Sequence, residues 1–362
     1  MVRVAIDVGP THGRRTGIGN AVAWTVDALA ERDGLDLQPY VTSARAQVKA
    51  PQRRLPLPAA LAVRMWAHRS TPMDRWLGNP DVVHGTNYVV PPARCARIVS
   101  VYDCWFLDHP EDAERDVQRA AAVLRRAVAD GAHVVTSSDA TTRRVRELLA
   151  TDRVRTVLLG PPMVDDHPET ATPPNGLPDH SEFILALGTM ERRKNLPTLV
   201  DAFGRLAREQ STVRLVIAGA PGNDVSAVDR AIARLPPAAA ARVVRTGTVD
   251  GATKHWLLTN ARALAYPSLD EGFGFPILEA QQMGTPVVAS TAGSIPQIAG
   301  AAALLSPARD SEALAANLYW IVTNDDMHAK LIRRGTANVA RFSWAGTAER
   351  YHSMYQEIAD DA

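Results

Sequence analysis

The sequence predicts an α/β protein built from two facing, doubly wound, Rossmann-like domains. The chain has 362 residues, which is long enough for two domains. Short apolar runs alternate with segments whose apolar residues recur at helical spacing, a pattern typical of parallel sheets covered by helices. Residues 160–181 hold six prolines and separate two such series. This stretch is therefore expected to be a stiff connector between the domains.

The first series is expected to begin with a buried strand over residues 2–8, followed by a loop and a helix over residues 19–30. A later helix is expected over residues 111–130, with Val117 among the apolar residues that face the core. Further strands are expected at residues 37–42, 82–84, 98–102, 134–136 and 154–159, and a further helix at 138–149.

The second series follows the connector and has the same alternation. Strands are expected at residues 182–188, 213–218, 243–247, 263–267, 285–290 and 302–305. Helices are expected at residues 195–208, 225–235, 253–260, 276–283, 311–323, 325–340 and 344–358.

Composition excludes several classes of protein. Charged residues make up 22% of the chain and the formal net charge is +1, whereas a nucleic-acid-binding domain is strongly basic. Cys95 and Cys104 have no metal-binding spacing, so they are expected to be reduced thiols of a cytosolic protein. No apolar run reaches the ~18 residues of a membrane span, and the N-terminus is typical of a strand and not of a signal peptide. A cytoplasmic location is expected, and contact with the inner face of the membrane stays open.

The most informative stretch runs from Glu271 to Glu279. Two carboxylates flank a Gly-x-Gly turn made by Gly272 and Gly274, and Pro276 follows, a residue favoured in the first turn of a helix. A strand, this loop, a helix and a strand form a βαβ unit, whose loop lies where open α/β sheets bind ligands. Backbone N–H groups of the loop and the helix N-terminus suit anions and hydroxyls. A nucleotide sugar fits such a site, and the alternative is a pair of solvated glutamates.

The segment from Tyr266 to Ser290, which reads YPSLDEGFGFPILEAQQMGTPVVAS, resembles the signature of the family-4 retaining glycosyltransferases of GT-B fold. The likeness extends over nearly the whole chain and is strongest between residues 182 and 307. It implies that the final helix returns to the first domain. The expected domains are then an acceptor-side domain of residues 1–160 plus 344–362 and a nucleotide-sugar-binding domain of residues 182–343, joined by the linker 161–181.

Arg193 and Lys194 lie just before a predicted helix, where two cations can hold a diphosphate. The alternative is a solvated basic loop. Members of the resembled family often carry an arginine at the start of this loop and a lysine five residues later. Lys194 matches that lysine, but Thr189 occupies the arginine position, so Arg193 is expected to supply the second charge.

Gly17 and Gly19 open the first predicted helix. The third glycine of a dinucleotide-binding fingerprint is absent, and the loop before them is too long for its tight turn. The segment resembles the family's N-domain loop, which closes over the phosphates of the donor, and the alternative is a simple helix-entry loop.

Tyr102 and Asp103 stand where the resembled family commonly has His-Asp beside the transferred sugar. A tyrosine can donate a hydrogen bond but does not titrate near neutral pH. Asp103 either orients an acceptor hydroxyl or caps the following turn. His84 is expected to be structural, whereas Asn87 and Tyr88 are candidates for the acceptor cleft.

Residues 45–75 are locally basic, with one tryptophan inside the segment and a second directly after it. They contact either an anionic acceptor or anionic lipid headgroups, or they form a solvated helix face. The basic residues are Arg45, Lys49, Arg53, Arg54, Arg64, Arg69 and Arg75, opposed by Asp74 alone, and the tryptophans are Trp66 and Trp76.

The resemblance implies a retaining, metal-independent hexosyltransferase that uses a nucleoside-diphosphate sugar, GDP-mannose or a UDP-hexose. The acceptor is expected to be a glycan or glycolipid hydroxyl in cell-envelope synthesis, and no metal or other cofactor is expected. Glu279 is assigned to the ribose hydroxyls. Glu271 is expected to hold the sugar hydroxyls together with the N–H groups of Gly272, Phe273, Gly274 and Phe275.

A non-catalytic nucleotide-sugar-binding protein on the same fold is the alternative, motivated by Tyr102 and Thr189. A sugar-nucleotide epimerase does not match the motif that contains Glu271 and Glu279. A glycogen-type synthase or phosphorylase is disfavoured, because no cofactor-lysine segment is visible and the chain is short for a phosphorylase.

Overall fold

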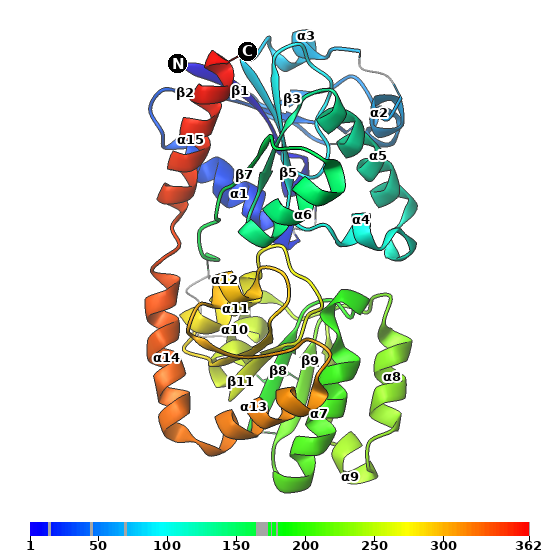
Figure 1. The fold of residues 1–362 in the computed structure, drawn as a ribbon, viewed down its shortest axis with the longest axis vertical. Coiled ribbons are helices and arrows are strands. Elements are labelled where there is room, and N and C mark those ends of the chain that lie inside the picture. Colours follow the sequence, from blue (N-terminus) through cyan, green and yellow to red (C-terminus); the bar gives the residue numbers. More distant parts are fainter. Residues whose placement is uncertain are drawn as a thin grey trace. The chain divides into compact units, whose positions relative to one another are not determined.

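The computed structural model describes residues 1–13, 16–43, 46–68, 71–163, 173–174, 176–178 and 180–361. The chain divides into two compact units, which we call the N-terminal domain (Met1–Gly160 with Phe342–Ala362) and the C-terminal domain (Pro161–Arg341). Each domain contains a parallel sheet with helices on both faces (Figure 1). The prediction of two Rossmann-like α/β domains is confirmed.

The described strands of the N-terminal domain form a parallel sheet in the order β3-β2-β1-β4-β5-β6-β7. From β1 the chain adds β2 and β3 on one side and then crosses back to add β4 on the other. The strand order therefore reverses between β1 and β4, which is the kind of switch point where open α/β sheets bind ligands. The strands are β1 (Val2–Asp7), β2 (Leu35–Val41), β3 (Arg53–Arg54), β4 (Val82–Gly85), β5 (Ala96–Val101), β6 (His133–Thr136) and β7 (Val154–Thr156).

Alternate residues of β1 supply two separate cores. Val4 and Ile6 pack with Leu29 on the face covered by α1 and α15, and Ala5 packs with Trp66 on the face covered by α2 and α5. The helices of this domain are α1 (Gly17–Ala30), α2 (Ala59–Trp66), α3 (Asp74–Leu77), α4 (Trp105–Asp108), α5 (Arg115–Ala129), α6 (Asp139–Leu149) and α15 (Trp344–Asp360), with 3-10 turns η1 (Gly9–Thr11) and η2 (Pro110–Asp112).

His84 joins the C-terminal helix α15 to the N-terminal sheet. Its Nδ1 lies 2.7 Å from the hydroxyl of Tyr355, and its Nε2 lies 2.8 Å from the hydroxyl of Ser100. Burial lowers the pKa of His84 to about 3, so the imidazole is neutral. The expected structural role of His84 is confirmed.

The described strands of the C-terminal domain form a parallel sheet in the order β10-β9-β8-β11-β12-β13. Here the order reverses between β8 and β11. The strands are β8 (Phe183–Leu187), β9 (Arg214–Ala218), β10 (Val243–Gly247), β11 (Ala263–Tyr266), β12 (Val287–Ser290) and β13 (Ala303–Ser306).

Two apolar clusters fill the C-terminal domain. One packs the sheet against α7, α8 and α13, and the other packs it against α10, α11 and α12. The helices are α7 (Leu196–Glu209), α8 (Val225–Ala233), α9 (Pro237–Ala240), α10 (Gly251–Asn260), α11 (Phe275–Gln282), α12 (Ile295–Ala299), α13 (Ser311–Thr323) and α14 (Asp325–Val339), with the 3-10 turn η4 (Arg192–Lys194).

Two sequence-based expectations for the N-terminal domain were wrong in detail. The helix expected from residue 111 begins at Arg115, because Pro110–Asp112 forms a 3-10 turn. Val117 is 39% exposed; the buried residues of α5 are Val123, Leu124 and Ala127, and the predicted Ala121 and Val128 pack against the same core.

The basic segment 45–75 contains β3, α2 and the start of α3, three short elements that the sequence pattern did not reveal. Trp66 is buried and Trp76 is exposed, so the two tryptophans do not share an environment. Arg45 and Arg69 lie outside the described residues. In the described part of the chain, no helix has the length and apolar character needed to cross a membrane.

The ends of the proline-rich connector pack onto the C-terminal domain. The carbonyl of Pro162 accepts a hydrogen bond of 3.1 Å from the side chain of Gln282, and Leu177 lies in the core beside α10 and α11. Pro168 lies outside the described residues.

Candidate functional site

The loops that follow β8 and β11 meet at the switch point of the C-terminal sheet. The amide of Leu269 donates to the carbonyl of Arg193 at 2.8 Å. The side chain of Asn195 donates to the carbonyls of Pro267 at 2.9 Å and Ala308 at 2.6 Å. These bonds hold the loop after β8, which carries Arg193 and Lys194, against the loop that carries Glu271.

Glu271 lies between the two predicted phosphate-binding cations. Its Oε2 accepts a hydrogen bond from Arg193 Nη1 at 2.5 Å, and its Oε1 accepts one from Lys194 Nζ at 2.7 Å. The side chains are 7%, 16% and 14% exposed for Glu271, Arg193 and Lys194. The interpretation of these residues as solvated surface groups is therefore wrong.

The buried charges of this cluster shift the pKa of the carboxyl group. Burial would raise the pKa of Glu271, but the charges of Arg193 and Lys194 outweigh it and lower that pKa to about 2. Burial lowers the pKa of Lys194, and the charge of Glu271 opposes that effect. Glu191 lies at the edge, 3.8 Å from Arg193, and its side chain is 44% exposed. The buried part of the cluster thus holds two cationic side chains around one carboxylate.

Tyr266 is the last residue of β11 and contacts this cluster through Lys194. Lys194 Nζ donates to its hydroxyl at 3.0 Å and lies 4.9 Å from its ring centroid. Burial and the charge of Glu271 raise the pKa of Tyr266 well above its ordinary value, so the hydroxyl stays neutral. Sequence analysis placed Tyr266 in the signature without giving it a role. Its position at the end of the strand that leads into the Glu271 loop was the available signal.

Glu279 lies on α11, the helix that follows the loop carrying Glu271. Its side chain is 12% exposed, and its Oε1 accepts a hydrogen bond of 2.5 Å from Lys254 Nζ on α10. Its charge is one of those that raise the pKa of Tyr266. Sequence analysis missed Lys254, because a residue 25 positions before Glu279 gives no local signal.

The loop from Glu271 to Gly274 is held by the segment after β12. The amide of Ser294 donates to the carbonyl of Glu271 at 3.0 Å, and the hydroxyl of Ser294 donates to the carbonyl of Phe273 at 2.8 Å. Gly293 has φ +55°, and a Cβ there would lie 2.6 Å from the Glu271 amide nitrogen. Gly274, with φ +102°, is the N-cap of α11. The loop therefore enters the helix as predicted.

Gly272, Phe273 and Gly274 are buried, and Phe275 is the first residue of α11. Thr189 lies after β8 and is partly exposed. Their predicted contacts with a donor stay predictions.

The predicted residues of the N-terminal domain lie on two separate segments of the chain. Gly17 and Gly19 lie in the first turn of α1, where the hydroxyl of Thr16 accepts a hydrogen bond of 3.3 Å from the Gly19 amide. Asp103 accepts bonds from the amide of Trp105 at 3.2 Å and, at 3.4 Å, from the hydroxyl of Tyr88.

The turn contact expected as one alternative for Asp103 is therefore present. Tyr102 packs edge-on against Tyr88, with ring centroids 6.3 Å apart. Burial raises the pKa of Tyr102 above its ordinary value, so this hydroxyl is neutral. Direct roles of Tyr102 and Asp103 in a reaction stay predictions.

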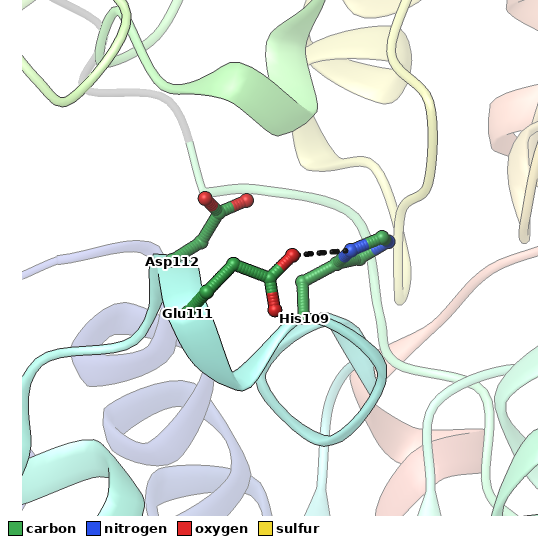
Figure 2. Close-up of side chains that lie close together, drawn as sticks. All are labelled: His109, Glu111 and Asp112. Carbon is green, nitrogen blue, oxygen red and sulfur yellow. Dashed lines mark hydrogen bonds and ion pairs between the residues drawn. The ribbon is translucent and has the colours of Figure 1, made fainter.

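Among the described residues, His109, Glu111 and Asp112 are the one group whose spacing suits a shared metal ion. Figure 2 shows Glu111 turned toward His109, and the Glu111 Oε1 lies 3.3 Å from His109 Nδ1. Asp112 instead accepts a hydrogen bond from the indole of Trp105 at 3.3 Å. These local contacts account for the cluster.

Comparison with known proteins finds a family model that matches part of the chain. Residues 181–324 match the family model described as Glycosyl transferases group 1. The O-antigen chain mannosyltransferase B of Escherichia coli is 27% identical over 289 residues, which cover 76% of this chain and 74% of that protein. A D-inositol 3-phosphate glycosyltransferase of Corynebacterium jeikeium is 28% identical over 203 residues, and this match spans 51% of the chain and 45% of that relative.

Solved structures show the fold. Sucrose-phosphate synthase from Thermosynechococcus elongatus has a TM-score of 0.72 at 18% identity and covers 100% of both chains. WaaG, a glycosyltransferase involved in lipopolysaccharide biosynthesis, has a TM-score of 0.68 at 14% identity and covers 97% of this chain and 99% of its own. Residues 181–324 are therefore similar to the glycosyl transferases group 1 model, and the chain has the GT-B fold.

Proposed function

We propose that this protein is a family-4 retaining glycosyltransferase that moves a hexosyl unit from a nucleoside-diphosphate sugar to a hydroxyl of a glycan or glycolipid. A mannosyl donor is the first choice, because the O-antigen mannosyltransferase relative matches over most of both chains. The observation that carries the proposal is the buried group of Arg193, Lys194 and Glu271 at the switch point of the C-terminal sheet.

The cluster suits a diphosphate next to a sugar. A lysine ammonium has three N–H donors, and the bonds of Lys194 to Glu271 and Tyr266 use two of them. The third can donate to a phosphate oxygen. The carboxylate of Glu271 holds both cations in place before the donor arrives, so little reorganisation is needed when charge develops on the leaving diphosphate.

We propose that transfer proceeds without a divalent cation, on the basis of charge balance. The leaving diphosphate gains negative charge as the glycosidic bond breaks, and Arg193 with Lys194 would stabilise that charge. The carboxylate of Glu271 would face the sugar side and support positive charge on the ring. Retention at the anomeric carbon is part of the proposal and carries no assignment of a covalent nucleophile.

Glu279 is proposed to bind the ribose hydroxyls. Lys254 occupies its Oε1 and so fixes the orientation of the carboxylate. The Oε2 is left to accept hydrogen bonds from a vicinal diol.

The acceptor side is proposed to lie in the N-terminal domain. Gly17 and Gly19 are proposed to contact the donor phosphates, with Tyr102 and Asp103 near the acceptor. Contact of residues 45–75 with an anionic membrane surface stays a prediction.

A thermal-shift screen with UDP-, GDP-, ADP- and TDP-sugars tests donor binding, because a ligand that binds the folded state raises the melting temperature, and a tighter ligand raises it more. We expect one nucleotide series to stabilise the protein. Release of free nucleotide on incubation with that donor and an acceptor pool then separates a transferase from the alternative, a non-catalytic nucleotide-sugar-binding protein. Stabilisation without nucleotide release would favour the alternative, and no stabilisation by any donor would overturn both.

A further inference from the structure

The switch point of the N-terminal sheet has a pocket of its own. The loops after β1, β2 and β4 surround a cavity of about 410 Å³, and α2 forms one wall. This volume lies within the ~300–1,000 Å³ typical of small-molecule sites. The cavity is on the sheet face opposite to α1, because its lining residue Trp66 belongs to the core cluster of α2 and α5.

Strand register places two polar side chains next to each other in this pocket. Asp7 and Tyr40 are paired in the parallel ladder of β1 and β2, and both line the cavity. Neighbouring residues of paired strands share a face, so the carboxylate and the phenol project together. Asp7 Oδ1 accepts a hydrogen bond of 2.8 Å from the Gly9 amide.

The phenol of Tyr40 is an unsatisfied group. The residue is 1% exposed, and its hydroxyl has no hydrogen-bond partner within the described residues. Nε2 of His12, another lining residue, is also buried without a partner in that part of the chain. Buried polar atoms are nearly always hydrogen-bonded, and an unmade bond costs about 1–3 kcal/mol. Two residues that line one cavity thus carry a polar atom without a partner among the described residues, and a ligand that reaches these atoms would supply one.

The rest of the lining defines the chemistry of that ligand. Ala59, Val63 and Trp66 of α2 give one wall an apolar surface, and Asn87 and Thr42 add polar groups to the lining. A sugar ring has this same combination of an apolar face and a hydroxylated edge. Burial raises the pKa of Asp7 to about 6, so the group is a carboxylate at neutral pH and would repel a phosphate at short range.

We propose that this pocket binds a neutral, hydroxyl-rich sugar ring of the acceptor, with Asp7 and Tyr40 hydrogen-bonded to its hydroxyls. The inference rests on the proposed transferase function and adds the acceptor class to it. Of the two kinds of relative reported above, it favours a glycan acceptor over a phosphorylated inositol.

Tyr40→Phe is the informative variant, because it removes the hydroxyl without removing a bond that the fold uses. Tyr319→Phe, at a tyrosine that is 40% exposed on α13, is the matched control. Binding is measured by ligand-detected NMR with methyl α-D-mannopyranoside, methyl α-D-glucopyranoside, myo-inositol and inositol 1-phosphate. One neutral hydrogen bond corresponds to about 1 kcal/mol, which is about fivefold in affinity.

We expect at least one neutral probe to bind the wild type and Tyr319→Phe alike, to bind Tyr40→Phe about fivefold more weakly, and to bind Asp7→Asn more weakly as well. Inositol 1-phosphate should bind less tightly than myo-inositol. Equal binding to all four proteins, no binding of any neutral probe, or preference for the phosphorylated probe would overturn the inference.

The donor thermal shift, measured on the same variants, should not change. If no donor raises the melting temperature of the wild type, the result counts against the proposed function. If a donor raises it but no neutral sugar binds, the result counts against the pocket alone.

Discussion

The two switch points of this chain have the same topology and opposite chemistry. In the C-terminal domain, Glu271 uses both carboxylate oxygens on buried cations, so every charge there is paired. In the N-terminal domain, Tyr40 is buried with no hydrogen-bond partner in the described structure. A parallel sheet therefore decides where loops converge, and the side chains on those loops decide whether the place attracts an anion or a hydroxylated ring.

The difference also concerns how each place is prepared for its ligand. Two cations fixed by one carboxylate are oriented before binding, which favours stabilisation of developing charge. An unpaired phenol gains its hydrogen bond only when a ligand enters. We accordingly expect substitutions in the cluster of Arg193, Lys194 and Glu271 to change turnover and folding. Substitution of the Tyr40 hydroxyl in the N-terminal pocket should change ligand affinity with little effect on folding.

The largest effect is expected for Glu271→Gln. The change leaves Arg193 and Lys194 buried without their anion, which should cost about 3–5 kcal/mol of unfolding free energy. Turnover should fall by about 10²–10³, the usual loss when a pre-oriented electrostatic group is removed. Urea unfolding and kcat are the measurements. Glu191→Gln, at an exposed neighbour of Arg193, is the control, and equal values for both variants would contradict the assignment.

The wild type and Glu271→Gln should also differ in how their stability depends on pH in the acid range. The pKa of Glu271 is lowered to about 2 in the folded protein, from an ordinary value of 4.5. A lowered pKa contributes stability above the unfolded value and loses it as the pH falls toward the folded one, here about 3 kcal/mol. The difference in unfolding free energy between the wild type and Glu271→Gln should therefore shrink between pH 4.5 and pH 2. A constant difference over that interval would show that the carboxylate charge is not what stabilises the cluster.

Lys194→Ala should weaken donor binding by about tenfold to a hundredfold, because a charged hydrogen bond is worth about 1.5–3 kcal/mol. The loss should become smaller as salt rises, since screening weakens the wild-type contact too. Isothermal titration with the donor found by thermal shift measures it. Lys330→Ala, on α14, serves as the comparison for loss of one positive charge. Unchanged affinity in Lys194→Ala would remove its phosphate-binding role.

A smaller effect is expected for the pair Lys254 and Glu279. Glu279→Ala should raise the donor KM about tenfold, and Lys254→Ala should raise it less, with kcat nearly unchanged in both. In the double variant, the Lys254 substitution should add little, because Lys254 is proposed to act through Glu279. Fully additive effects would mean that Lys254 binds the donor by itself or only stabilises the fold.

Sequence reasoning located the elements that have strong local signals. The order Gly272, Gly274, Pro276 predicted the entry of α11 within one residue, because glycine and proline restrict the backbone locally. Arg193, Lys194 and Glu271 were each named, and the strand order explains why their loops converge. Short elements such as α2 and α3 were missed, since one or two helical turns contain too few residues to show a period.

What could not be predicted depends on packing between distant segments. The contact of Lys254 with Glu279 requires the packing of α10 on α11. The pairing of Asp7 with Tyr40 requires the register of β1 and β2, which no local pattern encodes. Val117 has helical spacing with core residues and is still exposed, and spacing alone does not say which face of the first turn of α5 meets the core.

The most direct test of the central claim is a crystal structure of the protein with its nucleoside-diphosphate sugar bound. The account predicts phosphate oxygens within hydrogen-bonding distance of Arg193 and Lys194, with the ribose hydroxyls on the Glu279 carboxylate. A donor bound elsewhere, with the bonds of Glu271 to both cations unchanged and no phosphate near them, would contradict it.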